Sequence, residues 1–327
     1  MTIVERIRRA KEAVEAHKAV YYLNGEYTGA DFWDYAEIFE IIDDLYDVTG
    51  DPSILAQFEE MYGFIIKTYT ENWDKNPYND DIMWLVIALT RAYLFTGVEK
   101  YLILAKKNFS MVFARASSDD LGGGLLWKVG VDSKNTCVNC PGAIAASYLA
   151  EATGDPSYWD KAAYCLNWVI EKLFEADTGK VYDCIKLDGQ VSRWSSTYNQ
   201  GTFIGSCLAM WKHTGDGRYY RYAEAAMRYV MRDMYGCSVM DNEERGNDLP
   251  GFKGILARYV RRFAEDAGHP EALAWLRMNA DLAWKNRNTK GIMWTQLGHQ
   301  TEDKEDYDVF AVSAAVSVVV NAVGSTL

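Results

Sequence analysis

The consecutive carboxylates Asp80 and Asp81 are the residues of this sequence that best suit chemistry. They stand in the segment YNDDIMWLVIALT, directly before a long apolar run, so both belong to the first turn of an expected helix. Neighbouring helical residues point about 100° apart, which lets two carboxylates reach across a short gap. A gap of about 5 Å suits a retaining glycosidase, whereas inverting glycosidases hold their carboxylates about 6.5–9.5 Å apart.

The same pair has a purely structural interpretation, which the sequence leaves open. Asn79 or Asp80 could cap the helix, and the remaining carboxylate would then complement the helix dipole. In the catalytic interpretation, the helix N-terminus keeps one aspartate ionised as a nucleophile. Repulsion between the two charges raises the proton affinity of the other, which suits a general acid.

A recurrent turn motif indicates the elements that must position this pair. Each copy places a glycine where a helix C-cap wants a left-handed residue, followed in most copies by Asp, Pro or Glu suited to the start of the next helix. The copies are VTGDPS (48–53), FTGVEK (95–100), ATGDPSYW (152–159), HTGDGRYY (213–220) and DAGHPEAL (266–273). Their spacing predicts an internal repeat of helical hairpins.

Extending each turn in both directions predicts twelve helices joined alternately by short turns and long connections. The expected helices are 3–21, 32–48, 54–71, 79–96, 99–116, 141–153, 156–174, 198–214, 217–234, 250–267, 270–286 and 306–323. The long connections are 22–31, 72–78, 117–140, 175–197, 235–249 and 287–305. This pattern predicts an all-α fold, an (α/α)6 barrel or six-hairpin toroid, formed by residues 1–327 as a single domain. An open solenoid of helical pairs has the same local pattern.

The helices that enter the glycine turns are the more apolar set, and they are expected to form an inner ring. All six would begin on the face of the long connections, where their N-termini converge. Aromatic residues near these starts could stack on sugars or pack in the core. Trp33 and Trp127 are the aromatic candidates for sugar contact, whereas core packing is favoured for Trp84 and Trp294.

Composition excludes several other classes of function. The chain has 327 residues, 34 Lys+Arg against 46 Asp+Glu, and a net charge of -12 with its basic residues scattered. This balance argues against nucleic acid and anionic membranes as partners. The longest apolar stretch, 309–323, is shorter than the ~20 residues of a membrane span. The N-terminal segment lacks the apolar core of a secretion signal, which favours a cytoplasmic location unless a leader has been removed.

The cysteines predict neither a metal nor a cofactor. Cys137 and Cys140 form one CxxC pair, and the other four are dispersed without a second pair at metal-binding spacing. Free structural thiols are the favoured interpretation, with a zinc site and disulfides as alternatives.

Several motifs, taken together, resemble glycoside hydrolase family 76, the endo-α-1,6-mannanases. The resemblance runs in order along nearly the whole chain, through FWDYAEIFEIIDDLYDVTGD (32–51), NDDIMWLVIALTRAYLFTG (79–97), GGGLLW (122–127), KNTCVNCPGAIAASYLAEATGD (134–155), TYNQGTFIGSCLAMWKHTGD (197–216) and FKGILARYV (252–260). It implies an (α/α)6 barrel with net retention, Asp80 as nucleophile and Asp81 as general acid/base. The residues that it implies line or support the cleft are Trp127, Lys134, Asn135, Tyr198, Asn199, Gln200, Phe252 and Lys253. The third motif departs from the family's KNS-x-SNG pattern.

The expected function is hydrolysis of α-mannosidic linkages, α-1,6-mannan or its oligosaccharides above all, by double displacement without metal or cofactor. The alternatives are a non-catalytic glycan-binding toroid and a transglycosylase or hydrolase acting on another α-glycan. The expected partner is an oligosaccharide or polysaccharide substrate. A cytoplasmic location would favour short substrates. The exact linkage, the endo or exo mode and the oligomeric state are left open.

Overall fold

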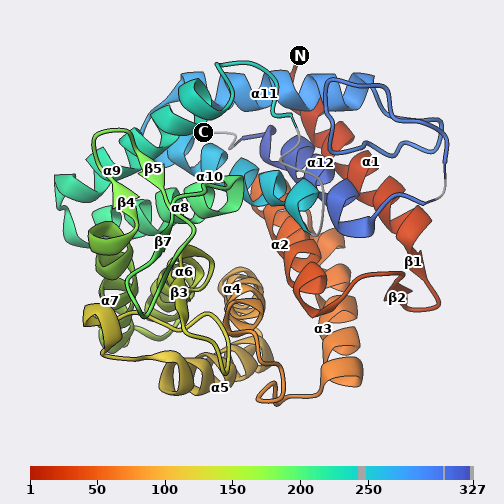
Figure 1. Cartoon of the computed structure of the whole chain (residues 1–327). Helices are drawn as coiled ribbons and strands as arrows, with labels where there is room; N and C mark the ends of the chain where they lie inside the picture. Colours follow the sequence, from red (N-terminus) through yellow and green to blue (C-terminus); the bar gives the residue numbers. More distant parts are fainter. Residues whose placement is uncertain (242–247, 305, 325–327) are drawn as a thin grey trace. The chain divides into compact units, whose positions relative to one another are not determined.

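The computed structural model describes residues 1–241, 248–304 and 306–324, and α-helices make up most of this part of the chain (Figure 1). The helices are α1 (Ile3–Tyr21), α2 (Phe32–Thr49), α3 (Leu55–Tyr69), α4 (Asn79–Thr96), α5 (Glu99–Ala116), α6 (Thr136–Thr153), α7 (Ser157–Lys172), α8 (Thr197–Thr214), α9 (Gly217–Arg228), α10 (Phe252–Asp266), α11 (Pro270–Lys285) and α12 (Val309–Asn321). The all-α prediction is confirmed for the described residues.

Short strands are confined to the long connections. They form three small antiparallel sheets, β1 with β2, β4 with β5, and β3 with β6 and β7. Their bounds are β1 (Tyr22–Leu23), β2 (Glu26–Tyr27), β3 (Ser133–Asn135), β4 (Phe174–Glu175), β5 (Lys180–Val181), β6 (Cys184–Lys186) and β7 (Val191–Ser192). The β3–β6–β7 sheet joins the connection before α6 to the connection before α8.

Left-handed glycines end the helices as the turn motif predicted. Gly50, Gly97, Gly154 and Gly215 have φ angles between 60° and 69° and follow α2, α4, α6 and α8. The N–H of each glycine donates to the carbonyl four residues earlier, which satisfies a group that the helix end leaves unpaired. Gly268, with φ 73°, lies just after α10.

Two helix starts differ from the prediction by three residues or more. The helix expected at 141 begins at Thr136, and Pro141 lies inside it. A proline lacks one N–H and usually stands in the first turn, which made it a misleading start signal. The last helix begins at Val309 rather than 306, because the Asp308 side chain accepts the N–H of Ala311 and caps it. Residues 242–247 of the predicted connection 235–249 and residue 305 of 287–305 lie outside the described residues.

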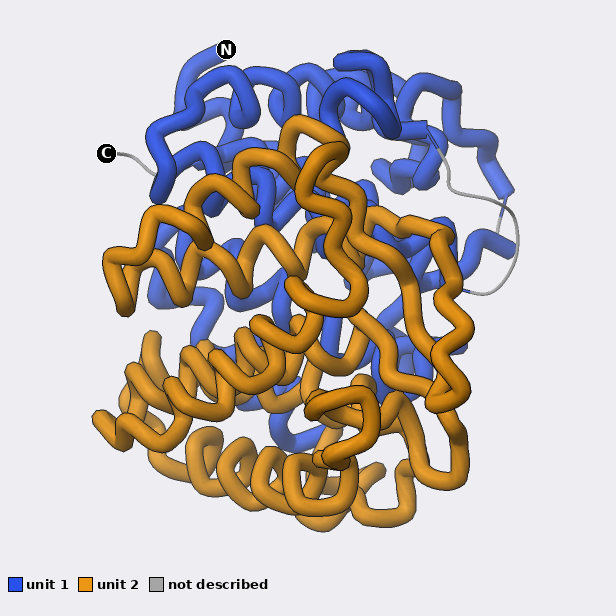
Figure 2. The backbone as a smooth tube through the Cα atoms, turned by 60° about the vertical axis from the view of Figure 1, so that its left-hand side comes forward, with its two compact units in different colours: residues 1–64, 230–327 blue, residues 65–229 orange. Residues whose placement is uncertain are grey.

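The chain separates into two compact units (Figure 2). Unit 1 is Met1–Phe64 with Val230–Leu327, and unit 2 is Ile65–Tyr229. In unit 2, α6 packs between α4 and α8, and each of these three helices also packs against the helix that follows it. In unit 1, α12 packs against α1, α2, α10 and α11. That residues 1–327 form a single domain stays a prediction.

The turn-entering helices are the buried ones in each unit, as predicted. Residues 82–92 of α4 and every residue of α12 are buried. Small residues allow the close packing: a Cβ on Gly254 of α10 would lie 2.8 Å from the Cα of Ala314 in α12. Among the described residues, no helix is both long enough and apolar enough to cross a membrane.

Unit 1 contains a buried network of charges that the sequence pattern did not predict. The Arg258 guanidinium lies 3.3 Å from carboxylate oxygens of both Glu37 and Glu40 and donates to Asp44 at 2.8 Å. All four side chains are at most 3% exposed. Burial raises the pKa of Glu37 to about 8, although the Arg258 charge opposes this shift. The single guanidinium thus compensates several carboxylates of α2.

We predict that Arg258→Leu lowers the free energy of unfolding by about 3–5 kcal/mol at pH 7, because it leaves buried carboxylates without their cation. Urea denaturation followed by far-UV circular dichroism measures this loss. Arg218→Leu is the matched control, since Arg218 forms an exposed pair with Asp216. Equal denaturation midpoints for the two variants would show that the network contributes nothing to stability.

Candidate active site

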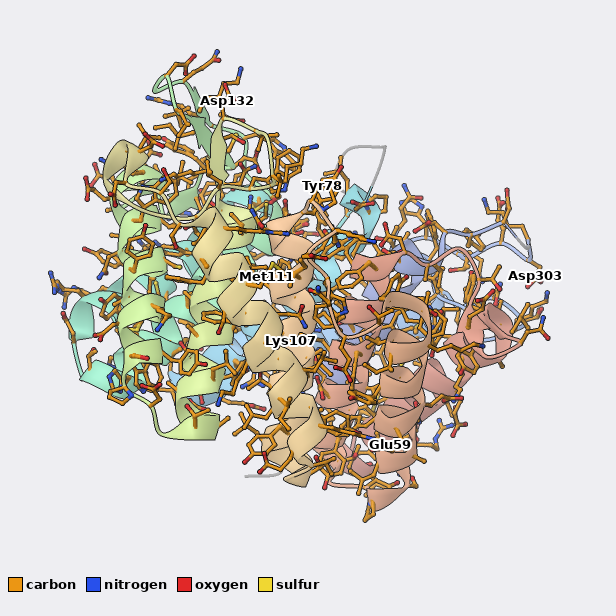
Figure 3. The ribbon with its side chains drawn as sticks, turned by 90° about the horizontal axis from the view of Figure 1, so that it is seen from below. Glu59, Tyr78, Lys107, Met111, Asp132 and Asp303 are labelled. Atoms are coloured by element: carbon orange, nitrogen blue, oxygen red, sulfur yellow. The ribbon has the colours of Figure 1, made fainter. Side chains whose placement is uncertain are left out.

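The first turn of α4 is not capped by the residues that the sequence suggested. Its N-cap residue is Tyr78, which makes no side-chain cap. The Asn79 side chain instead donates to the Leu126 carbonyl at 2.9 Å and accepts from Arg115 Nε at 2.7 Å. The interpretation of Asn79 or Asp80 as the N-cap residue is therefore wrong. Figure 3 shows Tyr78 at this end of α4. On α5, Met111 lies nearer to Tyr78 and Lys107 lies further from it.

Asp80 presents two unlike carboxylate oxygens. Its Oδ2 accepts from Trp127 Nε1 at 3.0 Å and from the thiol of Cys137, whose Sγ is 3.3 Å away. Its Oδ1 is also buried but has no hydrogen-bond partner among the described residues. A buried acceptor without a partner costs free energy, so a ligand group that interacts with Oδ1 would gain binding free energy.

Burial raises the pKa of Asp80 to about 6. The hydrogen bonds from Cys137 and Trp127, together with the backbone N–H groups of Asp80 and Asp81, favour the charged form and oppose the effect of burial. Asp80 is therefore largely ionised at pH 7, yet poorly hydrated, which is the state that a carboxylate nucleophile needs.

Asp81 has a different environment. It is half-buried, and its Oδ2 accepts from Asn76 Nδ2 at 3.1 Å. Asn76 belongs to the connection directly before α4, whereas the donors to Asp80 come from later segments. Two adjacent carboxylates in unlike surroundings can take unlike roles in catalysis.

Trp127 is held by a glycine-rich loop. Gly122, Gly123 and Gly124 all have positive φ angles, and a Cβ on Gly124 would lie 2.6 Å from the Trp168 ring. The Trp127 N–H donates to Ser133 O at 3.0 Å, and its carbonyl accepts the N–H of Asn79 at the same distance. Trp127 is half-buried, with the Tyr78 ring at a centroid distance of 5.7 Å and Lys128 Nζ 4.9 Å from its ring centroid.

Lys134 supports this loop. It is fully buried, and its ammonium donates to three backbone carbonyls, those of Ser118 (2.8 Å), Asp120 (2.6 Å) and Gly123. An ammonium has three N–H donors, so all of them are in use. The neighbouring Asn135 accepts from Ser133 Oγ at 3.0 Å. The structure thus places Lys134 behind the loop, where it does not face a ligand.

The start of α8 supplies a second group of polar atoms. Ser196 caps this helix by accepting the N–H of Asn199, so Tyr198, Asn199 and Gln200 all lie inside the helix and none is its N-cap residue. Asn199 Nδ2 donates to Asp183 Oδ1 at 3.2 Å, and Gln200 Nε2 donates to Ser195 Oγ at 3.1 Å. The amide oxygens of Asn199 and Gln200 are buried without a hydrogen-bond partner in the described part of the chain.

Two residues near Asp80 were not predicted as site residues from the sequence, namely Cys137 and Asp183. For Cys137 the sequence favours a structural thiol. Asp183, just before β6, lies close enough to Cys137 and Tyr198 to raise the pKa of each, as Asp80 also does. Burial raises the pKa of Asp183 itself. No signal singles it out, because the connection 175–197 also contains Asp177 and Asp188.

The remaining predicted residues belong to unit 1. Trp33 and Phe252 are 7% and 8% exposed, and the Trp33 ring packs against Phe310 and Phe252 at centroid distances of 4.7 and 6.3 Å. Lys253 is buried and donates to the carbonyls of Met240, Asp241 and Thr295 at 3.1, 2.7 and 2.8 Å. Sugar contact by these three residues stays a prediction.

The cysteines and acidic residues bear on the metal and disulfide alternatives. All six cysteines are free, so the disulfide alternative is wrong. Within residues 1–241, 248–304 and 306–324, no group of three or more His, Cys, Asp or Glu side chains could hold a metal ion. Neither finding bears on the carboxylate chemistry at Asp80.

The sequence model of Glycosyl hydrolase family 76 matches residues 8–326, and the chain belongs to this family. Among curated proteins, it is 27% identical over 244 residues to mannan endo-1,6-alpha-mannosidase DCW1 of Saccharomyces cerevisiae, a match that covers 66% of this chain and 54% of that protein. The chain thus spans about half the length of the curated relatives that it matches.

Solved structures give the fold. The GH76A alpha-1,6-mannanase of Salegentibacter sp. HEL1_6 is 28% identical, with a TM-score of 0.88 over 97% of this chain and 98% of that one. An inactive variant of that enzyme, in complex with alpha-1,6-mannotriose, carries asparagine in place of two consecutive aspartates. It matches with 26% identity and a TM-score of 0.89 over 97% and 99% of the two chains. The predicted fold class, an all-α (α/α)6 barrel, is confirmed.

We predict that Asp80→Asn stabilises the protein at neutral pH. Because folding raises the pKa of Asp80 from 3.8 to about 6, its ionisation costs stability as the pH rises through this interval, and the full cost is present above it. Asparagine removes the charge and should add up to about 2 kcal/mol at pH 7 and little at pH 4. Thermal unfolding at both pH values measures this, with the exposed Asp119→Asn as control. A pH-independent difference between the variants would contradict the desolvation of Asp80.

Proposed function

We propose that this chain is a retaining glycoside hydrolase that cleaves α-1,6-mannosidic linkages in mannan or its oligosaccharides. Asp80 is the nucleophile and Asp81 the general acid/base. The observation that carries the proposal is the Asp80 carboxylate, with one oxygen held by two donors and the other buried without a partner. Membership of the family and the likeness to an alpha-1,6-mannanase support the substrate class.

The choice of this carboxylate pair is supported by comparison with the others. Consecutive aspartates occur three times in the sequence, at 43–44, 80–81 and 119–120. The first pair is fully buried in α2, where Asp44 bonds to Arg258, and the last pair is exposed. The 80–81 pair stands at a helix start, half-buried and beside the half-exposed Trp127. The replacement of two consecutive aspartates in the inactive mannanase variant supports the same assignment.

Double displacement proceeds in two steps at the anomeric carbon. Asp80 Oδ1 attacks the anomeric carbon while the bond to the leaving oxygen breaks, and Asp81 gives that oxygen its proton. Water then attacks the same carbon, Asp81 takes a proton from the water, and the bond to Oδ1 breaks.

Sugar hydroxyls need acceptors, and the start of α8 provides them. The buried amide oxygens of Asn199 and Gln200 can accept hydrogen bonds from a sugar, and the Asp183 carboxylate stands beside Asn199. Trp127, which is half-buried and bonded to Asp80, supplies an aromatic ring beside the carboxylate for contact with a sugar. The predicted cytoplasmic location, and with it the preference for short substrates, stays a prediction.

The test is incubation of the purified protein with α-1,6-mannotetraose, with proton NMR of the first product. We expect shorter mannooligosaccharides that initially keep the α configuration. Asp80→Asn and Asp81→Asn should each lower kcat by about a thousandfold or more, because each removes a group that takes part in the bond changes. Asp119→Asn, in the exposed pair, should retain activity.

Three other results would reject all or part of this proposal. A first product of β configuration would show that the enzyme inverts the anomeric configuration, which rules out double displacement. Products longer than the substrate would identify a transglycosylase. Binding of mannotetraose in calorimetry without any cleavage would favour a non-catalytic glycan-binding protein.

A further inference from the structure

The buried thiol of Cys137 has a contact that the proposed reaction leaves unexplained. Cys137 lies in the first turn of α6 and is 2% exposed, with its Sγ 3.3 Å from Asp80 Oδ2. Trp127 Nε1, from the glycine-rich loop, lies 3.0 Å from the same oxygen. Two donors from different segments thus converge on one carboxylate oxygen, while Oδ1 receives none from the described residues.

We infer that Cys137 is a positioning residue, whose thiol and the Trp127 indole fix Oδ2 of Asp80 and so present Oδ1 as the attacking oxygen. The inference rests on the proposed function, in which Asp80 is the nucleophile. A carboxylate bound at one oxygen by a single donor can still turn about its Cβ–Cγ bond. Two donors in different directions fix its plane, and such preorganisation lowers the cost of reaching the transition state.

The site keeps this thiol in its donating form. Burial is the main cause that raises the pKa of Cys137 well above its ordinary value, and the Asp80 and Asp183 charges act in the same direction. The Tyr198 hydroxyl hydrogen-bonds to the thiol as well. With the tyrosine donating to the sulfur, the S–H proton is directed to Asp80. A neutral thiol is a weak donor, but here its acceptor is a charged and poorly hydrated carboxylate.

The same contact remains useful after the first step. Once Oδ1 is bonded to the anomeric carbon, Oδ2 becomes the carbonyl oxygen of the glycosyl ester and can still accept from both donors. As the ester bond breaks in the second step, negative charge returns to the carboxylate. Donors already aimed at Oδ2 stabilise that charge without reorganising.

Cys140 provides a matched control on the same helix. It is fully buried, as Cys137 is nearly so, and burial likewise raises the pKa of its thiol. Its neighbours are Ser206, Thr202 and Cys165, none of them a carboxylate. Replacing it by alanine removes a similar volume from α6 and leaves the donors to Asp80 in place.

The experiment compares Cys137→Ala, Cys137→Ser and Cys140→Ala with wild type, using α-1,6-mannotetraose. We expect Cys137→Ala to lower kcat about tenfold with KM unchanged, the loss for one hydrogen bond to a charged group. The acid limb of its kcat/KM profile should move to higher pH, because losing a donor to the carboxylate raises the Asp80 pKa. Serine should restore most of kcat, and Cys140→Ala should behave as wild type.

The titratable side chains of unit 2 that lie close to Asp80 are those of Asp81, Cys137, Asp183 and Tyr198. A shift in the pH profile must therefore be assigned to Asp80 by a separate measurement. Carbon-13 NMR of protein labelled at the aspartate carboxyl carbon provides this, with the Asp80 signal identified by its absence in Asp80→Asn. We expect Cys137→Ala to raise the Asp80 pKa and Cys140→Ala to leave it unchanged. Thermal unfolding verifies that every variant is folded.

The two measurements separate this inference from the proposed function. An unchanged Asp80 pKa in Cys137→Ala overturns the positioning role, whatever the activity. So does a Cys137→Ser variant that is no more active than Cys137→Ala. If Cys137→Ala shifts the Asp80 pKa but the wild-type protein cleaves no mannooligosaccharide, the contact between thiol and carboxylate is supported and the catalytic role of Asp80 is rejected.

Discussion

The carboxylate of Asp80 stays largely ionised at neutral pH, although it is withdrawn from water, because neutral donors from two other segments offset its lost hydration. The candidate site in unit 2 is organised around this balance. Trp127 can donate to Asp80 only if the glycine-rich loop keeps its conformation. Cys137 can do so only if α6 begins before Pro141. One desolvated charge thus sets requirements on segments that lie far apart in the sequence.

Buried cations provide much of the remaining organisation, and each unit has its own. In unit 2, Lys134 holds the glycine-rich loop through three carbonyls, and burial lowers the pKa of its ammonium. In unit 1, Lys253 contacts three carbonyls of long connections in the same manner. Arg258 compensates carboxylates instead. Each of these buried cations bonds to several polar groups at once, and so fixes loops or helices where apolar packing alone would leave several arrangements open.

Sequence reasoning succeeded where the cause is local. A glycine in the left-handed conformation ends a helix regardless of distant residues, so the turn motif predicted the bounds of α4 and α5 without error. It failed where the cause is distant. Glu37, Glu40 and Asp44 of α2 find their cations in Arg258 and Arg261 of α10. Arg258 lies 214 residues from Asp44. Cys137 and Asp80 are 57 residues apart in the sequence, and no pattern of residue types predicts their contact.

The packing of Trp168 on Gly124 gives α7 an influence beyond its own surface. The Trp168 indole fills the space that a side chain at position 124 would need, and its N–H donates to Leu121 O at 3.3 Å. The loop that carries Trp127 is therefore braced by a helix that supplies none of the candidate ligand contacts. For protein engineering, substitutions in α7 are therefore a way to shift the position of Trp127 while Asp80, Asp81 and the residues bonded to them are left unchanged.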